Sequence, residues 1–372
     1  MEVKLKDIAS FSKGKQINGD NLVDDGQYVF LNGGINPSGK WHEYNVAGNS
    51  IAISEGGNSC GYVNYMDKPF WCGAHCYFLY DLKYDAKYIY YALKSQQDSI
   101  MQLRSGACMP NIKKSALGEF TFSIEEDSTK QAIAVASLDK VSGLIVLRKE
   151  QLAKLDQLVK SRFIELFGDP VSNPMGWDMP LIEDVVAKEK NALKAGPFGS
   201  ALKKEYYVSS GYKIYGQEQV ISGDHTFGDY YIDEERYQAL QNCAVQAGDV
   251  LISLVGTYGK LLVMPEEFEP GIINPRLMKI TFDKKKVNPY YFQHYFQSDS
   301  LKKALAENTH GGTMDILNLG IVRKLAMPVP PLELQDAFIT FVKQTDKSKL
   351  AIQQSLDKLE TLKKSLMQEY FG

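Results

Sequence analysis

The side chains most able to bind a metal lie in one short segment, Trp71-Cys72-Gly73-Ala74-His75-Cys76. Two thiolates and an imidazole could supply three of the four ligands that a structural zinc ion needs. A second pair of ligands at zinc-finger spacing is missing, because Cys60 and Cys108 lie far from this segment along the chain. We therefore expect no metal site, and we expect the cysteines to be free thiols.

Two further segments contain parts of catalytic motifs. Asn288-Pro289-Tyr290-Tyr291 is similar to the Asn/Asp-Pro-Pro-Tyr/Phe motif of amino-methyltransferases, but the second proline is missing and no glycine-rich cofactor loop precedes it. An amphipathic helix from Tyr290 to Phe296, started by the proline, is the better interpretation. Gly256-Thr257-Tyr258-Gly259-Lys260 lacks the spacing and the following Ser/Thr of a P-loop. No histidine pairs convincingly with a nucleophilic Ser or Cys. The sequence predicts no catalytic residues.

The strongest pattern in the chain is an internal repeat. The segment from Leu152 to Gly168, LAKLDQLVKSRFIELFG, returns from Leu356 to Gly372 as LDKLETLKKSLMQEYFG, with nine of 17 positions identical. Ordinary composition would give roughly one match. Gln131 and Gln335 have the same separation, 204 residues, as the two glycines. Two copies of one helical segment predict two copies of a larger unit.

Composition limits the class of protein. At 372 residues the chain exceeds one typical core, and a hydrophobic content of 44% excludes a disordered chain. No apolar run is long enough to cross a bilayer, and no apolar stretch follows the lysines of the first 15 residues. We therefore expect no signal peptide and a cytoplasmic location. The net charge of −3 argues against a surface coated in positive charge, so any contact with nucleic acid must be local.

Periodicity gives the expected architecture. Residues 1–124 and 169–328 contain short apolar runs followed by turn residues, such as Tyr28 to Leu31 before Asn32-Gly33-Gly34 and Ser50 to Ser54 before Gly56-Gly57. Residues 125–168 and 329–372 carry apolar positions at three-four spacing without an internal proline beyond the Pro330-Pro331 lead-in. In the first of these segments the predicted seam consists of Leu138, Val141, Ile145, Leu152, Leu155, Val159 and Leu166. We expect an α+β protein in which two mainly β domains are separated by two long antiparallel coiled-coil helices and related by a pseudo-two-fold axis.

These features together resemble one family, the specificity (S) subunits of type I restriction-modification enzymes. Three segments carry the resemblance: Gly196-Pro197-Phe198-Gly199-Ser200-Ala201-Leu202-Lys203, Gly248-Asp249-Val250-Leu251-Ile252 leading to Gly256 to Lys260, and Pro330-Pro331-Leu332-Glu333-Leu334-Gln335 before the last helix. The first half departs from the pattern, because residues 125–131 lack the Pro-Pro-Leu lead-in and no tryptophan opens the chain as Trp177 opens the second domain.

The resemblance implies a non-catalytic DNA-binding protein. Each globular domain would be a target recognition domain that reads one half of a bipartite, asymmetric site in double-stranded DNA, and the helix pair would set the unread spacer. The same helices would dock two methyltransferase (M) subunits, which bind S-adenosylmethionine and methylate adenine N6. Restriction (R) subunits would add ATP- and Mg-dependent translocation and cleavage. The chain itself would hold no cofactor and no metal.

Loops on a rigid scaffold are where base-reading side chains are expected. In the first domain we expect Asn32, Asn36, Ser38 and Lys40 in the turn after Leu31, together with Asn58 and Ser59, to contact DNA. In the second domain the candidates are Gln217 and Glu218 after the strand ending at Tyr215, then Thr257, Tyr258, Lys260 and Arg276. Lysines at Lys113, Lys114, Lys203 and Lys204 are candidate phosphate contacts, which add affinity without sequence information. For each residue an ordinary turn or surface role remains open.

The long helices also offer a candidate docking surface. Leu158 and Leu362 lie off the predicted helix seam at equivalent repeat positions, as two identical partner subunits would require. Alternatively, these leucines only pack on the domains beside them. Three other functions remain open: a self-sufficient methyltransferase or nuclease, a coiled-coil scaffold with two β modules, and the S-like subunit of a type IIB system.

Overall fold

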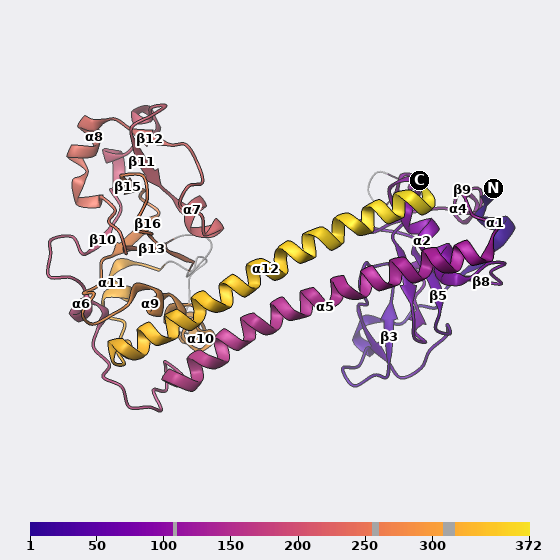
Figure 1. Cartoon of the computed structure of the whole chain (residues 1–372), viewed down its shortest axis with the longest axis horizontal. Helices are drawn as coiled ribbons and strands as arrows, with labels where there is room; N and C mark the ends of the chain where they lie inside the picture. The colour runs from indigo at the N-terminus through magenta and orange to yellow at the C-terminus, as the bar shows by residue number, and fades with distance from the viewer. Residues whose placement is uncertain (107–109, 255–259, 308–316) are drawn as a thin grey trace. The chain divides into compact units, whose positions relative to one another are not determined.

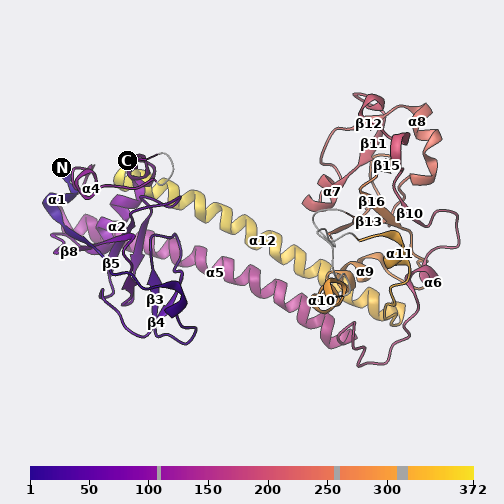
Figure 2. The same cartoon turned by 180° about the vertical axis from the view of Figure 1, so that it is seen from behind.

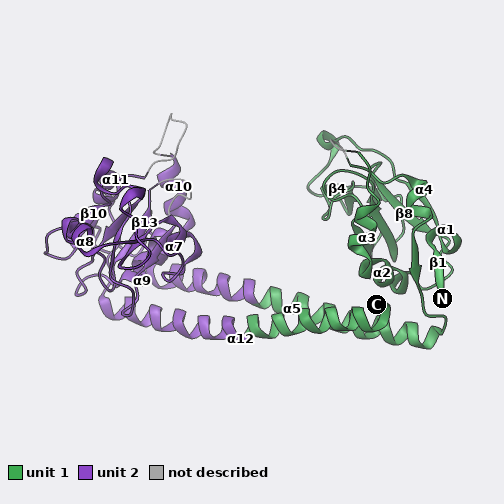
Figure 3. Cartoon of the chain, turned by 90° about the horizontal axis from the view of Figure 1, so that it is seen from above, with its two compact units in different colours: residues 1–151, 352–372 green, residues 152–351 purple. Residues whose placement is uncertain are grey.

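The computed structural model describes residues 1–106, 110–254, 260–307 and 317–372. The chain divides into two compact units, which Figure 3 shows in different colours. Unit 1 comprises residues 1–151 and 352–372, and unit 2 comprises residues 152–351. Each unit contains part of both long helices, α5 (Ser128–Phe167) and α12 (Leu332–Phe371), because each part packs on the domain beside it (Figure 1).

The two long helices run antiparallel where they pair within each unit. In unit 1 the Tyr370 hydroxyl donates to the Ser137 hydroxyl at 3.4 Å, and Lys149 lies 3.0 Å from Glu360. In unit 2 Lys349 of α12 lies 2.6 Å from Asp156 of α5. Rising residue numbers on one helix thus meet falling numbers on the other, as the sequence predicts.

The seam between the helices follows the predicted spacing with two additions. Leu138 and Val159 are buried as predicted, whereas Leu152 is only half-buried. Phe163 and Phe167, which the predicted seam omits, are both buried and pack against Phe338 of α12 with ring centroids 5.5 and 5.4 Å away. Aromatic side chains therefore replace leucines where α5 enters the core of unit 2.

Unit 1 contains two main sheets (Figure 2). One has the order β2-β8-β5-β6 and is antiparallel; the other has the order β4-β3-β7, in which β3 and β7 are parallel. A short sheet pairs β1 with β9. The elements are β1 (Glu2–Lys4), α1 (Leu5–Ile8), β2 (Ser10–Lys13), β3 (Tyr28–Leu31), β4 (Gly39–Trp41), β5 (Ser50–Ser54), β6 (Val63–Met66), β7 (Trp71–Cys72), β8 (Cys76–Tyr80), α2 (Ala86–Ser95), α3 (Gln97–Gln102), α4 (Lys114–Gly118) and β9 (Thr121–Ser123).

Unit 2 repeats the two main sheets strand for strand, while the β1–β9 pair corresponds to a single bridge between Leu181 and Ala326. Its sheets have the orders β10-β16-β13-β14 and β12-β11-β15, again with one parallel pair, β11 with β15. The elements are α6 (Ile182–Val185), β10 (Leu193–Ala195), β11 (Tyr212–Tyr215), α7 (Gln217–Ser222), β12 (Tyr231–Ile232), α8 (Glu234–Ala239), β13 (Val250–Ser253), β14 (Leu261–Val263), β15 (Gly271–Ile273), β16 (Leu277–Ile280), α9 (Pro289–Phe296), α10 (Asp299–Glu307) and α11 (Leu319–Arg323). The repeat predicted from the helices therefore extends through both domains.

The four-stranded sheet of each unit lies between two apolar clusters. In β5, Ile51 and Ile53 face the cluster that contains α2, Leu138 and Phe371, while Ala52 faces the three-stranded sheet. Strand β13 alternates in the same way between the α9 side and the three-stranded sheet. Burial on both faces explains why these strands read as continuous apolar runs rather than as alternating ones.

Helices α2 and α9 occupy equivalent places and begin with equivalent caps. The Asp85 carboxylate accepts from the Tyr88 amide, and the Asn288 side chain accepts from the Tyr290 amide. Pro289 fills the first helical position, where its missing N–H costs no hydrogen bond. The predicted proline-started helix is confirmed, and Asn288 serves as its cap. Over the described residues, no helix is long and apolar enough to cross a membrane.

Candidate nucleic-acid interface

In unit 2, polar side chains gather where β11, β13 and β15 end. The Arg276 Nη1 donates to the Gln217 Oε1 at 3.3 Å, and the Gln217 Nε2 donates to the Ser253 hydroxyl at 2.8 Å. Ser253 is fully buried at the end of β13, whereas Arg276 is exposed. The Arg276 amide donates to the Asn274 side chain at 2.9 Å, which fixes the turn between β15 and β16. We call this cluster the unit 2 tip: Gln217, Ser253, Asn274 and Arg276.

The structure thus brings together two residues that the sequence singled out separately, Gln217 and Arg276. Lys260 lies next to Ser253, whose amide donates to the Lys260 carbonyl at 3.0 Å. The Lys260 side chain is exposed. Glu218 is exposed in the first turn of α7. Thr257 and Tyr258 lie outside the described residues.

In unit 1, hydrogen bonds from two serine hydroxyls and to the side-chain amide of Asn32 stabilise the equivalent tip. The Ser54 and Ser59 hydroxyls both donate to the Gly33 carbonyl, Ser59 at 2.5 Å. The Asn32 Oδ1 accepts from the His75 amide at 3.1 Å, so Asn32 holds the turn that precedes β8. Asn58 is exposed on the same loop as Ser59. Asn32 and Ser59 therefore position this tip, whereas Asn58 presents a free face to solvent.

A buried serine ends the equivalent strand at each tip. Ser54 and Ser253 are both fully buried, each at the end of the equivalent strand. Each contacts the segment that follows the first strand of the three-stranded sheet, but with opposite roles: the Ser54 hydroxyl donates to the Gly33 carbonyl, and the Ser253 hydroxyl accepts from the Gln217 side chain at the start of α7. The scaffold of the tip is thus conserved between the units while the side chains on it differ.

A pocket of about 620 Å³ at the unit 1 tip is lined by the predicted Asn32 and by side chains that the sequence did not single out as DNA contacts. Lys13 forms an ion pair with Glu55 at 2.5 Å on its wall, and the exposed His75 and Asn111 complete the polar lining. These residues come from four distant segments, so spacing along the chain gives no signal for them. One local signal exists: a Cβ at Gly14 would lie 1.9 Å from the Cys72 carbonyl oxygen, so this backbone contact requires glycine.

The predicted turn after Leu31 is a longer hairpin than expected. Asn36 and Ser38 are exposed in it, and the Ser38 amide donates to the Phe30 carbonyl at 2.9 Å. Lys40 is not in the turn: it lies on β4 opposite Val29, and its ammonium donates to the Asp24 carbonyl at 3.2 Å. The prediction that Lys40 lies in the turn is therefore wrong, because β4 begins at Gly39 and pairs with β3.

The candidate phosphate-binding lysines are all exposed, with different neighbours. Lys113 follows Ile112, whose amide donates to the Glu55 carbonyl at 2.9 Å, so Lys113 lies near the unit 1 pocket. Lys114 begins α4, with its ammonium 5.4 Å from the Phe11 ring centroid. Lys203 is 3.3 Å from Glu205, and Lys204 begins the short 3₁₀ helix Lys204–Tyr206.

The segment considered for zinc is part of the core. Cys72 and Cys76 are buried against Leu31 and Phe70 in unit 1, and the hydrogen bond with the neighbouring Cys76 thiol, together with burial, raises the pKa of Cys72 well above its usual range. A protonated thiol is a poor metal ligand. In the part of the chain that the structure describes, no three His, Cys, Asp or Glu side chains lie close enough to hold a metal ion.

The predicted docking leucines lie on the open faces of the long helices. The exposed fraction is 47% for Leu158 and 46% for Leu362. Val146 and Leu350, a second pair at the same repeat spacing, are exposed to 55% and 61%. Packing on the neighbouring domain therefore buries only part of the surface of each side chain. Apolar surface of this kind at two equivalent places is typical of an interaction surface.

Comparison with known proteins gives a consistent family. The family model described as "Type I restriction modification DNA specificity domain" matches residues 1–157 and 175–363. A Mycoplasma pneumoniae protein named as a type I specificity subunit is 36% identical over 154 residues, which cover 41% of this chain and 40% of that protein. The MjaVIII specificity subunit of Methanocaldococcus jannaschii is 19% identical over 302 residues, 76% of this chain and 68% of that protein. The chain thus spans about two fifths of the length of the first relative.

Solved structures show the same fold. The crystal structure of a type I restriction-modification S subunit from M. genitalium aligns over 100% of this chain and 96% of that one, with a TM-score of 0.63 and 20% identity. A chain from a study of the assembly of a type I restriction-modification system aligns over 100% and 97%, with a TM-score of 0.60 and 13% identity.

Proposed function

This chain belongs to the family of type I restriction-modification DNA specificity subunits, which are non-catalytic, and we propose that it reads a bipartite DNA site with one half at each unit. The observation that carries the proposal is the pair of tips. Seven strands in the same order position both tips, yet one carries Gln217 and Arg276 and the other carries Asn58 beside a polar pocket. A repeated scaffold with different polar ends is what reading two unlike half-sites requires.

The chemistry of the tips suits base edges in the major groove. Arginine can donate two hydrogen bonds to guanine O6 and N7, and glutamine or asparagine can bond adenine N6 and N7. The contact between Arg276 and Gln217 holds both side chains before DNA arrives, which reduces the entropy cost of ordering them. In unit 1 the corresponding contacts to base edges would come from the side-chain amides of Asn58 and Asn36. Lys13 and His75 at the pocket would add further polar contacts.

The long helices would set the spacer between the half-sites. Both α5 and α12 are continuous over 40 residues, and the ion pairs Lys149 to Glu360 and Lys349 to Asp156 fix their register. A helix pair of this kind is stiffer than an irregular linker, as a spacer of one length requires. The recognised DNA would then be two short sequences at one separation.

Two copies of a methyltransferase subunit would dock on the helices. Leu158 and Leu362, with Val146 and Leu350, offer the same apolar pairs twice. S-adenosylmethionine would be bound by those partners, and ATP and Mg by restriction subunits that join through them, all in the cytoplasm. The chain itself would bind no cofactor.

Co-expression with the methyltransferase encoded beside this chain tests the function. We expect the two proteins to co-purify, and methylome sequencing of a methylation-free host carrying both genes should give one bipartite N6-methyladenine motif that disappears without this chain. A complex that methylates no motif would contradict the proposed reading role, and a partner that also cleaves DNA would indicate a type IIB system. The absence of any complex would favour the scaffold function.

A charge at either docking leucine tests the partner surface. Leu158→Glu and Leu362→Glu should each reduce the bound methyltransferase from two copies to one, because a carboxylate in an apolar contact must be desolvated. Native mass spectrometry counts the copies. Ser161→Glu, which introduces the same charge on α5 at an already polar exposed position, is the matched control and should retain both copies. Two copies bound to both leucine variants would exclude this surface.

A further inference from the structure

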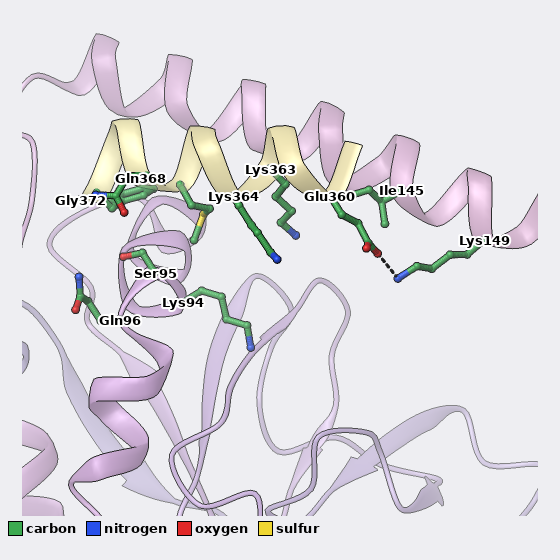
Figure 4. Close-up of a pocket in the computed structure, with 12 residues that line it drawn as sticks. Lys94, Ser95, Gln96, Ile145, Lys149, Glu360, Lys363, Lys364, Gln368 and Gly372 are labelled. Atoms are coloured by element: carbon green, nitrogen blue, oxygen red, sulfur yellow. Dashed lines mark ion pairs between the residues drawn. The ribbon is translucent and has the colours of Figure 1, made fainter. Parts of the chain in front are cut away.

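Four lysines line one pocket of about 510 Å³ in unit 1 (Figure 4). Lys94 approaches from the end of α2, Lys149 from α5, and Lys363 and Lys364 from α12. The carboxylate side chain in the lining is Glu360, which forms an ion pair with Lys149 at 3.0 Å. We call this site the lysine pocket; its side chains carry a clear excess of positive charge.

The cations of the lysine pocket are crowded and partly buried. Burial, with Lys363 as a second cause, lowers the pKa of Lys94 to about 8. Burial and the charge of Lys149 lower the pKa of Lys363, while Asp139 and Glu360 oppose this effect. Like charges held this close raise the free energy of the folded unit, so an anion placed among them would be stabilised.

The lysine pocket is tied to the loop that carries Asn58. The Lys94 ammonium donates to the Val63 carbonyl at 3.0 Å and lies 3.5 Å from the centroid of the Tyr62 ring. The Tyr62 amide in turn donates to the carbonyl of Ser59 at 2.9 Å. The Gln97 side chain, which accepts from Lys94 at 2.9 Å, also donates to the Gly61 carbonyl at 2.7 Å. One hydrogen-bonded network therefore joins the pocket to a candidate base-reading turn.

Unit 2 has a pocket at the equivalent place in which two lysines, Lys160 and Lys302, are balanced by two aspartates, Asp169 and Asp299. It has a volume of about 310 Å³ and lies between α5, α9 and α10. At the repeat spacing of the helices, Lys364 corresponds to Lys160, whereas Lys363 corresponds to Val159 and Lys149 to Gln353. By the matching caps of α2 and α9, Lys94 corresponds to Gln297. The retained Lys160 is paired with Asp299 at 3.1 Å. The shared fold therefore does not require the lysine cluster.

We infer that the lysine pocket binds phosphodiester groups of the DNA backbone beside the half-site that unit 1 reads. This inference rests on the proposed function. Double-stranded DNA carries one negative charge per about 1.7 Å of helix axis, and lysines contact it as point charges that displace counterions. Phosphate contacts fix the register of a protein on the duplex without reading sequence. Unit 1 would thus hold the backbone more strongly than unit 2 does at the equivalent place.

The test uses the full chain in complex with its methyltransferase, and a duplex that carries the motif from methylome sequencing. The variant Lys363→Gln with Lys364→Gln removes two cations; Lys140→Gln with Lys347→Gln removes two exposed cations elsewhere on the same helices. Fluorescence anisotropy gives the affinity for the motif duplex and for a scrambled duplex between 50 and 200 mM salt. The pocket variant should bind both duplexes roughly tenfold more weakly, and the slope of log K against log salt should fall by about 1.8.

Four further results separate a phosphate site from a structural role. The pocket variant should keep the parent's ratio of motif to scrambled affinity and a Tm equal to or above the parent's, because it relieves repulsion around Lys94. Lys363→Arg with Lys364→Arg should restore the salt slope. The control variant, Lys140→Gln with Lys347→Gln, should have a slope of log K against log salt within experimental error of the parent's.

Several outcomes would overturn the inference while leaving the proposed function intact. An unchanged salt slope would do so, as would loss of bound methyltransferase from the pocket variant, which would assign the pocket to an acidic protein surface. A Tm raised by inorganic phosphate in the parent and not in the variant, with equal DNA slopes, would assign it to a free anion. A parent complex that binds motif and scrambled duplexes equally would instead contradict the proposed function.

Discussion

Unit 1 and unit 2 have the same strand order and different polar interiors. In unit 2 the Lys279 ammonium of β16 lies 3.0 Å from the Asp249 carboxylate, and both residues are buried. At the equivalent places unit 1 has Phe78, which pairs with Ala52 across the sheet, and Ser50, whose hydroxyl donates to the Ala47 carbonyl at 2.8 Å. The same fold therefore forms with an ion pair or with an aromatic ring in this layer. The comparison teaches that strand pairing and apolar burial fix the scaffold, whereas individual polar groups are free to diverge.

The largest expected difference between the units concerns this ion pair. Asp249→Ala would leave the Lys279 cation buried without its partner, and we expect unit 2 to lose about 3–5 kcal/mol of unfolding free energy. Ser50→Ala, the matched change in unit 1, should cost below about 1 kcal/mol, because it removes one exposed hydrogen bond to the Ala47 carbonyl. Hydrogen exchange of the β13 and β5 amides measures the two effects. Equal losses in both units would contradict the comparison.

The second difference is a pH dependence confined to unit 2. Burial lowers the pKa of His294 to about 4; Lys349 acts in the same direction and Asp346 opposes it. The unfolded chain takes up this proton below about pH 6.5, so unit 2 should lose stability as pH falls from about 6.5 to 4, by up to about 3 kcal/mol. The residue at the equivalent place in unit 1 is Tyr91, which keeps its proton throughout this range.

Replacing the histidine tests this assignment. His294→Tyr introduces the unit 1 residue and should remove most of the loss between pH 6.5 and 4, as followed by urea unfolding at each pH. His225→Tyr, at a partly exposed position of unit 2, is the control and should leave the pH dependence intact. An unchanged profile for His294→Tyr would exclude this histidine as the source.

A third difference concerns base reading. Arg276→Ala should cost about 1–3 kcal/mol against duplexes with the correct second half-site and leave discrimination at the first half-site unchanged. Asn58→Ala should show the reverse pattern. Competition binding with duplexes altered in one half at a time measures both. Weaker binding to every duplex alike would mean that these side chains contact phosphates instead.

The smallest expected difference lies in the flanking lysines. Lys113→Gln should reduce the salt slope of DNA binding by about 1. Lys203→Gln should reduce it less, because Lys203 already has a carboxylate partner, Glu205, at 3.3 Å. Salt titrations of the two variants beside the parent give the comparison. A larger effect at Lys203 would show that its ion pair opens in the complex.

Local features of the fold were predictable from the sequence. Strands β3 and β5 have the predicted limits, because apolar runs bounded by Asn-Gly-Gly and Gly-Gly leave little choice of strand end. The long helices α5 and α12 follow from apolar spacing and from the lack of internal prolines. Phe163 and Phe167 were missed, because their burial depends on α9 and α12 and not on the seam alone.

The candidate site was only partly predictable. Gln217 was singled out because it follows the strand ending at Tyr215, and Arg276 was named as a separate candidate; parallel pairing of β11 with β15 brings the two together. Lys13, His75 and Asn111 could not be found this way, since sheet pairing joins segments that share no sequence spacing. Lys40 was misplaced because nothing local marks where a hairpin resumes pairing. Long-range register is what the sequence alone does not supply.

The central claim, that each unit reads one half of the site, is tested most directly by changing one tip and sequencing the methylome. A methylation-free host would carry the methyltransferase with either the parent chain or the Gln217→Ala, Arg276→Ala variant. The account predicts that the variant relaxes or changes the second half of the N6-methyladenine motif while the first half and the spacer length stay the same. Alteration of both halves together, or an unchanged motif, would contradict it.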